Sequence, residues 1–289
     1  MSSISIDVKT KPQSTSWQWL QEMWLASDAI EFVRAIWLFD HLRPIFESTD
    51  EPCFEGWTLL SRLSADTKRS KVGIMVSNTL LRNVVLLAKM VTTIDSFTLG
   101  RLEIGLGAGW DQKEMLSAGI VFPSAISRLV LLDEQCTALR ELLQVGTSSF
   151  SGSHVHLDEA KSFPLSIQRP HPPFTIGGTG PKMLELVAQH ADCWNYPGFS
   201  VGGFTKKLEL LRIATVKIGR EKIPIPSTQI SISPNFTKET ALLISDYVLA
   251  GAERLILYFE HPFSPDTLES TVAKVVEHID SLQLDLDKQ

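Results

Sequence analysis

Short apolar segments alternate with amphipathic segments along the whole chain, and this alternation constrains the fold more than any other feature. A parallel sheet with helices packed outside it requires that order. The predicted strands are Ser3–Val8, Val33–Phe39, Lys71–Val76, Leu102–Leu106, Pro173–Ile176, Asp192–Asn195, Gln229–Ser233 and Arg254–Tyr258. The predicted helices are Trp17–Ser27, Trp57–Ala65, Val84–Asp95, Ala125–Leu143, Pro181–His190, Phe204–Ile218, Lys238–Leu249 and Pro265–Leu282. Eight such units predict an α/β fold, the (β/α)8 TIM barrel.

Two longer segments interrupt the alternation. Gln112–Phe122 follows the fourth strand, and Ser149–Pro170 precedes the fifth strand. The second segment has the pattern of a hairpin-like flap with an extended, proline-rich exit. Because 289 residues suit one barrel and no linker is evident, residues 1–289 are interpreted as a single domain with insertions after strand 4 and before strand 5.

A glycine-rich segment ends the fourth strand. Gly105, Gly107 and Gly109 occupy alternate positions, with Ala108 between the last two. A strand end without side chains allows another flat group to lie against its backbone, and a cofactor ring is the obvious candidate. The spacing does not match the dinucleotide fingerprint, because Trp110 stands where its last glycine belongs. A sharp turn with no ligand is the alternative.

A second glycine cluster follows the fifth strand and precedes a helix. Its residues are Gly177, Gly178, Thr179 and Gly180. Pro181 suits the first position of the helix, where free N–H groups and the helix dipole favour an anion. Lys182 then lies in the first turn, where its charge opposes the dipole unless an anion binds. The pattern favours a phosphate site, and a tight turn without a ligand is again the alternative.

Polar residues follow two other strands. Asp40 and His41 come directly after the second strand, where barrel residues face the active site, and a histidine there can transfer protons near neutral pH. The alternative is a cap by Asp40 with His41 at the surface. Val76, Ser77 and Asn78 end the third strand. Ser77 and Asn78 could bind a ligand ring, or Asn78 could cap a helix that begins near Leu80.

Composition and missing motifs exclude several classes of function. The net charge of −6 and the scattered lysines and arginines argue against a nucleic-acid partner. No apolar run reaches the length of a membrane span. Cys53, Cys136 and Cys193 are far apart and lack metal-binding spacing, which predicts a cytoplasmic protein without a metal. His154 and His156 are interpreted as the solvated face of the flap. Motifs of serine hydrolases, P-loop enzymes and zinc proteases are absent from the sequence.

The chain resembles the bacterial-luciferase-like superfamily of flavin- and deazaflavin-dependent oxidoreductases. The segments that carry this resemblance are Ile36–Leu42, Leu87–Asp95, Gly100–Trp110 with Glu114, Phe150–Gly152, Gln168–Pro173, Gly177–Gly180 and Ala191–Asn195. Their order and spacing are more specific than any one of them. The glycine-rich segment is most similar to the subgroup assigned to the deazaflavin coenzyme F420. The resemblance implies a (β/α)8 barrel that holds the cofactor ring at its C-terminal mouth.

The resemblance also implies roles for individual residues. Asp40 would bind the ring, and His41 would be the proton donor or acceptor beside it. The segment Met75–Asn78 would pass behind the ring, in some relatives with a non-proline cis peptide. Gly107 to Gly109 would line the cofactor, and Gly177 to Gly180 would hold its phosphate.

The chain departs from the family where some deazaflavin enzymes carry a catalytic glutamate directly after the glycine run. This chain has Trp110 there, and Glu114 is not an obvious substitute. The expected function is hydride transfer between coenzyme F420 and a small organic substrate. The alternatives are a two-component monooxygenase that uses reduced FMN and a non-catalytic flavin-binding protein. The expected partners are the substrate, a second copy in a homodimer, and a flavin or F420 reductase.

Overall fold

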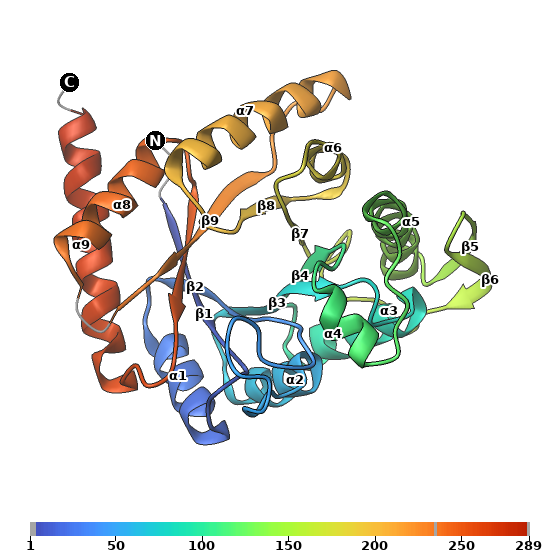
Figure 1. Cartoon of the computed structure of the whole chain (residues 1–289), viewed down its shortest axis with the longest axis horizontal. Coiled ribbons are helices and arrows are strands. Elements are labelled where there is room, and N and C mark those ends of the chain that lie inside the picture. The colour runs from blue at the N-terminus through green and yellow to red at the C-terminus, as the bar shows by residue number, and fades with distance from the viewer. Residues whose placement is uncertain (1–3, 234–235, 288–289) are drawn as a thin grey trace.

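The computed structural model describes residues 4–233 and 236–287 and contains a closed barrel of parallel strands in the order β1-β10-β9-β8-β7-β4-β3-β2. Its strands are β1 Ser5–Thr10, β2 Val33–Leu38, β3 Lys71–Asn78, β4 Leu102–Gly107, β7 Phe174–Gly177, β8 Cys193–Tyr196, β9 Ile225–Ser231 and β10 Arg254–Phe259. Figure 1 shows helices arranged around the outside of these strands. The predicted (β/α)8 barrel is confirmed.

The helices cover the barrel with their apolar faces. They are α1 Trp17–Ala29, α2 Gly56–Asp66, α3 Val84–Phe97, α4 Gln112–Ser117, α5 Ala125–Gln144, α6 Pro181–His190, α7 Val201–Lys217, α8 Lys238–Leu249 and α9 Leu268–Asp287, preceded by the 3-10 turn η1 Pro265–Thr267. In α6, for example, Met183, Leu184, Val187 and Ala188 are buried, which is the spacing of one helical face. Helices α6 and α8 have the predicted bounds.

Two predicted strands are displaced from those of the structure. The strand predicted at Gln229–Ser233 is wrong in its bounds, since β9 begins four residues earlier at Ile225. Polar residues such as Ser227 hid its beginning, because they face the barrel lumen; the Ser227 hydroxyl donates to the backbone oxygen of Trp194. The first strand runs Ser5–Thr10 rather than Ser3–Val8, and Ser3 lies outside the described residues.

A buried network of charges fills the N-terminal end of the lumen. The Arg34 guanidinium contacts both the Asp7 carboxylate, at 2.7 Å, and the Glu103 carboxylate. Arg254 lies 3.4 Å from Glu103 Oε2, which Arg34 also contacts, at 3.2 Å. Burial alone would raise the pKa of Glu103, but the positive charges of Arg34 and Arg254 outweigh it and hold that pKa below its usual value. Each carboxylate here has a basic partner, and the network closes the bottom of the barrel.

The two insertions lie where the sequence predicts them. The first contains α4, and the second contains most of an antiparallel hairpin, β5 Thr147–Ser151 and β6 His156–Lys161, which begins two residues before the predicted segment. The hairpin projects beyond α5 at one edge of the molecule (Figure 1). Its turn is held by Glu134 of α5, whose carboxylate accepts three backbone N–H groups, from residues 153 to 155.

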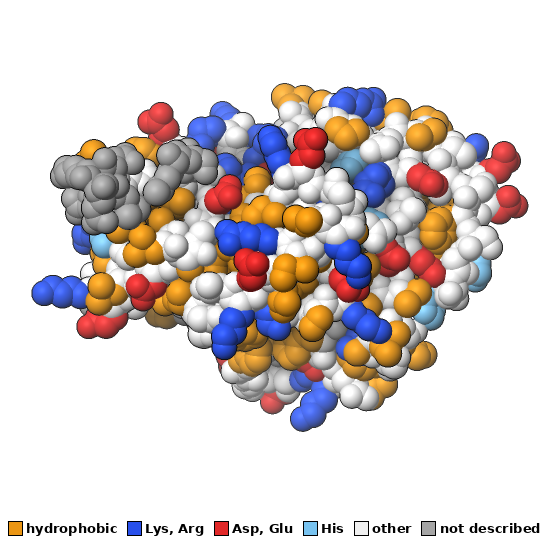
Figure 2. Space-filling view, turned by 90° about the horizontal axis from the view of Figure 1, so that it is seen from above, with side chains coloured by type: hydrophobic (Ala, Val, Ile, Leu, Met, Phe, Trp, Pro, Cys, Tyr) orange, Lys and Arg blue, Asp and Glu red, His pale blue; other side chains and the backbone are white. Residues whose placement is uncertain are grey.

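The surface mixes charge types. Figure 2 shows basic, acidic and hydrophobic side chains interspersed over the face in view. Among the described residues, no helix has the length and apolar character needed to cross a membrane.

Candidate active site at the barrel mouth

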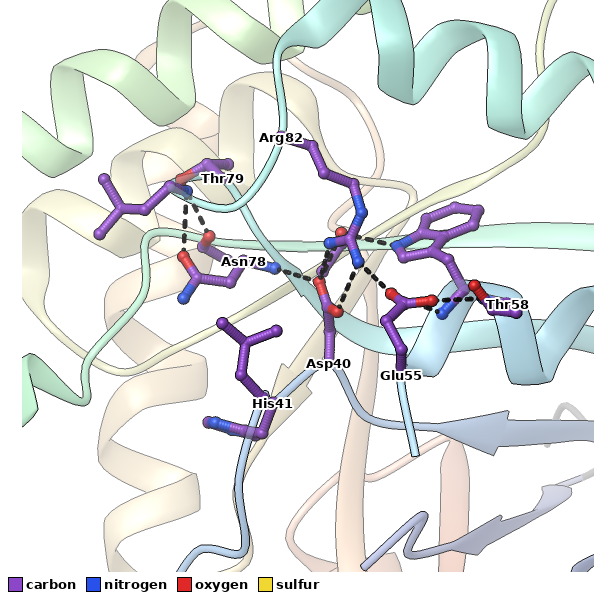
Figure 3. A network of polar contacts seen from close by, with 12 residues as sticks. Asp40, His41, Glu55, Thr58, Asn78, Thr79 and Arg82 are labelled. Atoms are coloured by element: carbon purple, nitrogen blue, oxygen red, sulfur yellow. Dashed lines mark hydrogen bonds and ion pairs between the residues drawn. The ribbon is translucent and has the colours of Figure 1, made fainter. Parts of the chain in front are cut away.

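Asp40 joins the ends of two neighbouring strands. It follows β2, and its buried carboxylate accepts hydrogen bonds from the Ser77 hydroxyl and the Asn78 backbone N–H, both at 3.1 Å. Arg82 adds a two-pronged contact, at 2.5 and 3.0 Å (Figure 3). Because protein donors occupy both oxygens, Asp40 fixes the positions of Ser77 and Asn78 rather than presenting a free carboxylate to the mouth.

Arg82 extends this network to α2. Its guanidinium also pairs with Glu55, the N-cap residue of α2, whose carboxylate accepts the backbone N–H groups of Trp57 and Thr58. The Trp57 indole N–H donates to the Ser77 hydroxyl at 3.0 Å. Sequence analysis missed Arg82 and Glu55, since nothing in their spacing distinguishes them from ordinary loop residues.

Asn78 does not cap a helix, so that alternative is wrong. Helix α3 begins at Val84 and Asn83 is its cap. The Asn78 side-chain oxygen instead accepts the Leu80 N–H at 3.0 Å within the turn after β3.

The end of β3 has an irregular backbone. The peptide bond between Met75 and Val76 is cis, as the family resemblance implies for some relatives. The pairing of β3 with β4 shifts register between Ile74 and Ser77. The half-buried Val76 side chain packs against a cluster in the lumen formed by Ala35, Trp37, Met75 and Ile256. Val76 therefore lies on the inner surface of the mouth.

The glycines of the two clusters make room for β3. A Cβ atom on Gly107 would lie 2.5 Å from a Val76 methyl group, and one on Gly177 would lie 3.3 Å from the other methyl group. A Cβ on Gly105 would lie 2.1 Å from the backbone oxygen of Ile74. The close approach inferred from the sequence exists, but Val76 and the β3 backbone make it. Val76 is then the surface on which a flat ring can rest.

His41 lies at the mouth with one ring nitrogen engaged. Its side chain is 12% exposed, and Nδ1 lies 2.9 Å from a carboxylate oxygen of Glu114. The other Glu114 oxygen accepts the Leu42 N–H at 2.6 Å. The rings of Phe39 and Trp110 contact the imidazole edge-on. With Nδ1 held by Glu114, Nε2 is the nitrogen left for a ligand.

Glu114 is a candidate site residue that sequence analysis set aside. It is buried in α4, whose N-cap Asp111 accepts the Glu114 backbone N–H. An acid three residues after an N-cap Asp is the pattern of a capping box, in which the acid turns back to the helix start. Here the Glu114 carboxylate turns to His41 instead, and only the three-dimensional contact reveals this role.

The N-terminus of α6 presents free N–H groups. Gly180 is the N-cap residue and makes no side-chain cap bond, and Pro181 follows it. A Cβ atom on Gly180 would meet no atom within 4 Å, so the space in front of the helix is open. Gly178 has a φ of +140°, which favours glycine, and Thr179 is half-buried. This cradle fits a phosphate group.

A polar chain crosses the lumen on the mouth side. Lys9 Nζ donates to the Gln229 side-chain oxygen at 2.8 Å, and the Gln229 amide donates to the Asn195 oxygen at 2.8 Å. Burial, helped by the nearby charge of Lys11, lowers the pKa of Lys9 from 10.5 to about 7. Sequence analysis missed Lys9, because the predicted first strand ends at Val8 and a single lysine after it resembles a solvated residue.

Metal binding has no cluster to support it in the described part of the chain. There, no group of three or more His, Cys, Asp or Glu side chains is placed to hold a metal ion. His154 contacts the Ser127 hydroxyl at 2.9 Å.

Comparison with known proteins gives a consistent family. The family model described as luciferase-like monooxygenase matches residues 28–250. Pyrimidine monooxygenase RutA of Rhizobium rhizogenes is 32% identical over 177 residues, which cover 58% of this chain and 47% of that protein. The matched part thus spans about half the length of that relative.

Solved structures share the fold. An F420-dependent secondary alcohol dehydrogenase, in complex with an F420-acetone adduct, superposes with a TM-score of 0.85 at 14% identity, covering 96% of this chain and 99% of that one. Monooxygenase RslO1 from Streptomyces bottropensis superposes with a TM-score of 0.76 at 16% identity, covering 95% and 98%.

The contact between Gly107 and Val76 predicts a compensating pair of substitutions. Gly107→Ala should lower the free energy of unfolding by about 1–3 kcal/mol, because its methyl group overlaps a Val76 methyl group. The double variant with Val76→Ala should lose at least ~0.5 kcal/mol less free energy of unfolding than the sum of the two single variants. Urea unfolding of the four proteins measures this. Gly180→Ala, which meets no atom within 4 Å, is the control and should add to Val76→Ala without compensation. Additive losses of stability in Gly107→Ala and Val76→Ala would contradict the contact between these two residues.

The buried Lys9 predicts a pH-dependent stability. Its pKa of about 7 in the folded protein lies below 10.5, so the unfolded chain binds the extra proton between these values. Stability therefore rises as the pH increases from 7 toward 10.5. Lys9→Met should stabilise the protein at pH 6, and this gain should exceed the gain at pH 9.5 by on the order of 3 kcal/mol. Urea unfolding at the two pH values, with Lys11→Met as the control, measures it. An equal stabilisation by Lys9→Met at the two pH values would contradict the low pKa of Lys9.

Proposed function

The chain belongs to the luciferase-like monooxygenase family, and we propose that it uses reduced coenzyme F420 for hydride transfer to or from a small organic substrate. The observation that carries this proposal is the contact between His41 and Glu114 at the mouth. Hydride addition to a carbonyl carbon leaves an oxygen that needs a proton, and a histidine with one nitrogen fixed can supply it from the other. Family membership supports an enzyme over a non-catalytic flavin-binding protein.

The residues at the mouth fit a cofactor with a flat ring and a phosphate. Val76, Ser77 and Asn78 would lie behind the ring, and Gly107, Ala108 and Gly109 would line its edge. Gly177, Gly178, Thr179 and Gly180 would hold the phosphate at the uncapped N-terminus of α6. When bound, the deazaflavin supplies or accepts the hydride. Asp40 would act on the ring indirectly, by holding Ser77 and Asn78.

His41 would handle the proton of the reaction. The Glu114 carboxylate orients the imidazole through Nδ1, so that Nε2 can donate to a substrate oxygen or accept from a substrate hydroxyl. Phe39 and Trp110 pack against the imidazole ring of His41 and limit the access of water to it. Glu114 is thus a positioning residue, and His41 is the proposed catalytic residue.

A monooxygenase that uses reduced FMN is the second candidate. The similarity to pyrimidine monooxygenase RutA favours it, at an identity higher than that of the structural neighbours. The same phosphate cradle would suit FMN, which has a single phosphate. We also propose that the protein is one cytoplasmic domain over residues 1–289, acts as a homodimer, and receives reduced cofactor from a separate reductase.

Separate titrations with the two cofactors test the proposal. The purified protein should bind F420 at least tenfold more tightly than FMN, as followed by the absorbance or fluorescence of each cofactor. It should also oxidise bound reduced F420 when a suitable carbonyl compound is added. Tighter binding of FMN, or oxygen consumption with reduced FMN, would favour the second candidate instead.

A substitution at Gly180 separates phosphate binding from helix stability. Gly180→Asp should weaken cofactor binding at least tenfold, about 1.4 kcal/mol, because its carboxylate repels the phosphate and competes for the free N–H groups. The same aspartate should stabilise the protein by a few tenths of a kcal/mol, since it caps α6. Cofactor titration and urea unfolding measure the two effects. Gly180→Ala, which has room for its methyl group, is the control and should retain cofactor binding. Unchanged affinity in Gly180→Asp would rule out a phosphate at this helix.

His41 and Glu114 should respond differently to substitution. His41→Ala should slow single-turnover hydride transfer by roughly 10²–10⁴ and leave F420 affinity nearly unchanged. Glu114→Gln should slow it less, by roughly tenfold at neutral pH, because the neutral amide orients the imidazole through a weaker contact at Nδ1. Stopped-flow measurements with a carbonyl compound that the wild type reduces give both rates. A normal single-turnover rate in His41→Ala would show that His41 lines the site without transferring the proton.

A further inference from the structure

We propose that Lys9 binds the carboxylate of an organic-acid substrate in the lumen at the barrel mouth. This inference deepens the proposed function and rests on it for the position of the reacting ring. Lys9 is the penultimate residue of β1. Strand β10 lies between β1 and β9, yet Lys9 Nζ reaches Gln229 of β9 at 2.8 Å. The two side chains therefore meet across the lumen and not along the outer surface.

Register places Lys9 beside the proposed cofactor surface. Lys9 pairs with Trp37 of β2 and with Tyr258 of β10. Trp37 belongs to the lumen cluster against which Val76 packs. Strand β2 ends one residue after Trp37, and the chain continues to His41. Lys9 thus lies on the strand next to the one that carries the proposed proton donor.

The hydrogen bonds of the polar chain leave Lys9 with unused donors. The Gln229 amide donates to the Asn195 oxygen, and the Asn195 amide donates to Ser227, so the Gln229 oxygen must face Lys9. An ammonium group has three N–H donors and no acceptor. Among the described residues, Gln229 is the side chain that accepts one of them. Two donors remain for a ligand.

Lys9 also lacks a counter-charge. The neighbouring Lys11 pairs with two acids, at 2.9 Å from Glu47 and 2.8 Å from Glu260. No described acid lies within 4.0 Å of Lys9, whereas each buried acid at the opposite end of the lumen has an arginine partner. A buried cation without a partner is costly, and a bound anion removes that cost.

A carboxylate with an apolar body fits these surroundings. Its two oxygens can accept the two free N–H donors, and its charge balances the ammonium. The half-buried Tyr258 ring lies 5.1 Å from Lys9 Nζ, and the stacked rings of Phe46 and Trp110 lie exposed beside His41. These rings offer contacts to carbon atoms of the substrate. Burial and the charge of Lys11 lower the pKa of Lys9, and a bound anion would raise that pKa again.

An NMR titration tests this inference with sodium benzoate as the probe. The full-length protein is labelled with 13C at the lysine side chains, and the Lys9 signal is identified by its loss in Lys9→Met. Without benzoate, the signal should titrate with a midpoint near 7. Saturating benzoate should raise the midpoint by about one unit, because the anion binds the charged amine at least tenfold more tightly than the neutral amine. Benzamide, and sodium chloride at equal ionic strength, should leave the midpoint unchanged.

Lys11→Met is the matched control, because its ammonium already has two acid partners. This variant should keep the rise in midpoint that benzoate causes at Lys9. No rise in the wild type, an equal rise with benzamide or chloride, or loss of the rise in Lys11→Met would overturn the proposal. The titration needs no cofactor, so failure of F420 binding would overturn the proposed function and leave this result standing.

Discussion

The buried carboxylate of Asp40 holds the mouth of this barrel together. It receives hydrogen bonds from Ser77 and Asn78 at the end of β3 and a two-pronged contact from Arg82 ahead of α3. Arg82 in turn pairs with Glu55, the residue that caps α2. Loss of one partner from such a buried network leaves the others without compensation. The shape of β3 behind the proposed ring therefore depends on Asp40, although the Asp40 carboxylate is buried and does not itself face the mouth.

The lumen divides its charges between its two ends. At the N-terminal end, Arg34 and Arg254 balance Asp7 and Glu103, so each of these four charged side chains lies beside an opposite charge. At the mouth, Lys9 is buried with an amide oxygen as its partner, and no acid of the described residues lies within 4.0 Å of it. A fold tolerates an unpaired buried charge at a cost in stability, and such residues concentrate where a protein binds or reacts. The paired charges at the N-terminal end therefore suit a structural role, and the unpaired Lys9 at the mouth suits the proposed ligand binding.

The barrel could be predicted from the sequence because its strands and helices are short, apolar and regularly spaced. The ends of β1 and β9 could not, because residues left out of the predicted strands, such as Lys9, Ser227 and Thr228, are polar and resemble loop residues. Sequence motifs also located His41 and the glycine clusters. They could not show that Glu114 turns to His41, or that Lys9 meets Gln229, because these contacts join residues 73 and 220 positions apart.

The glycines at the mouth show why a motif can be located correctly and explained incompletely. The sequence predicts a bare surface for a ring at Gly105 and Gly107, and their missing side chains do leave space. The β3 backbone at Ile74 and the Val76 side chain fill that space. The glycines of β4 and β7 thus admit a bulged strand, and that strand carries the surface proposed for the ligand. A substitution at Gly107 would reach a bound ring through Val76, so its effects on stability and on cofactor binding should share one physical cause.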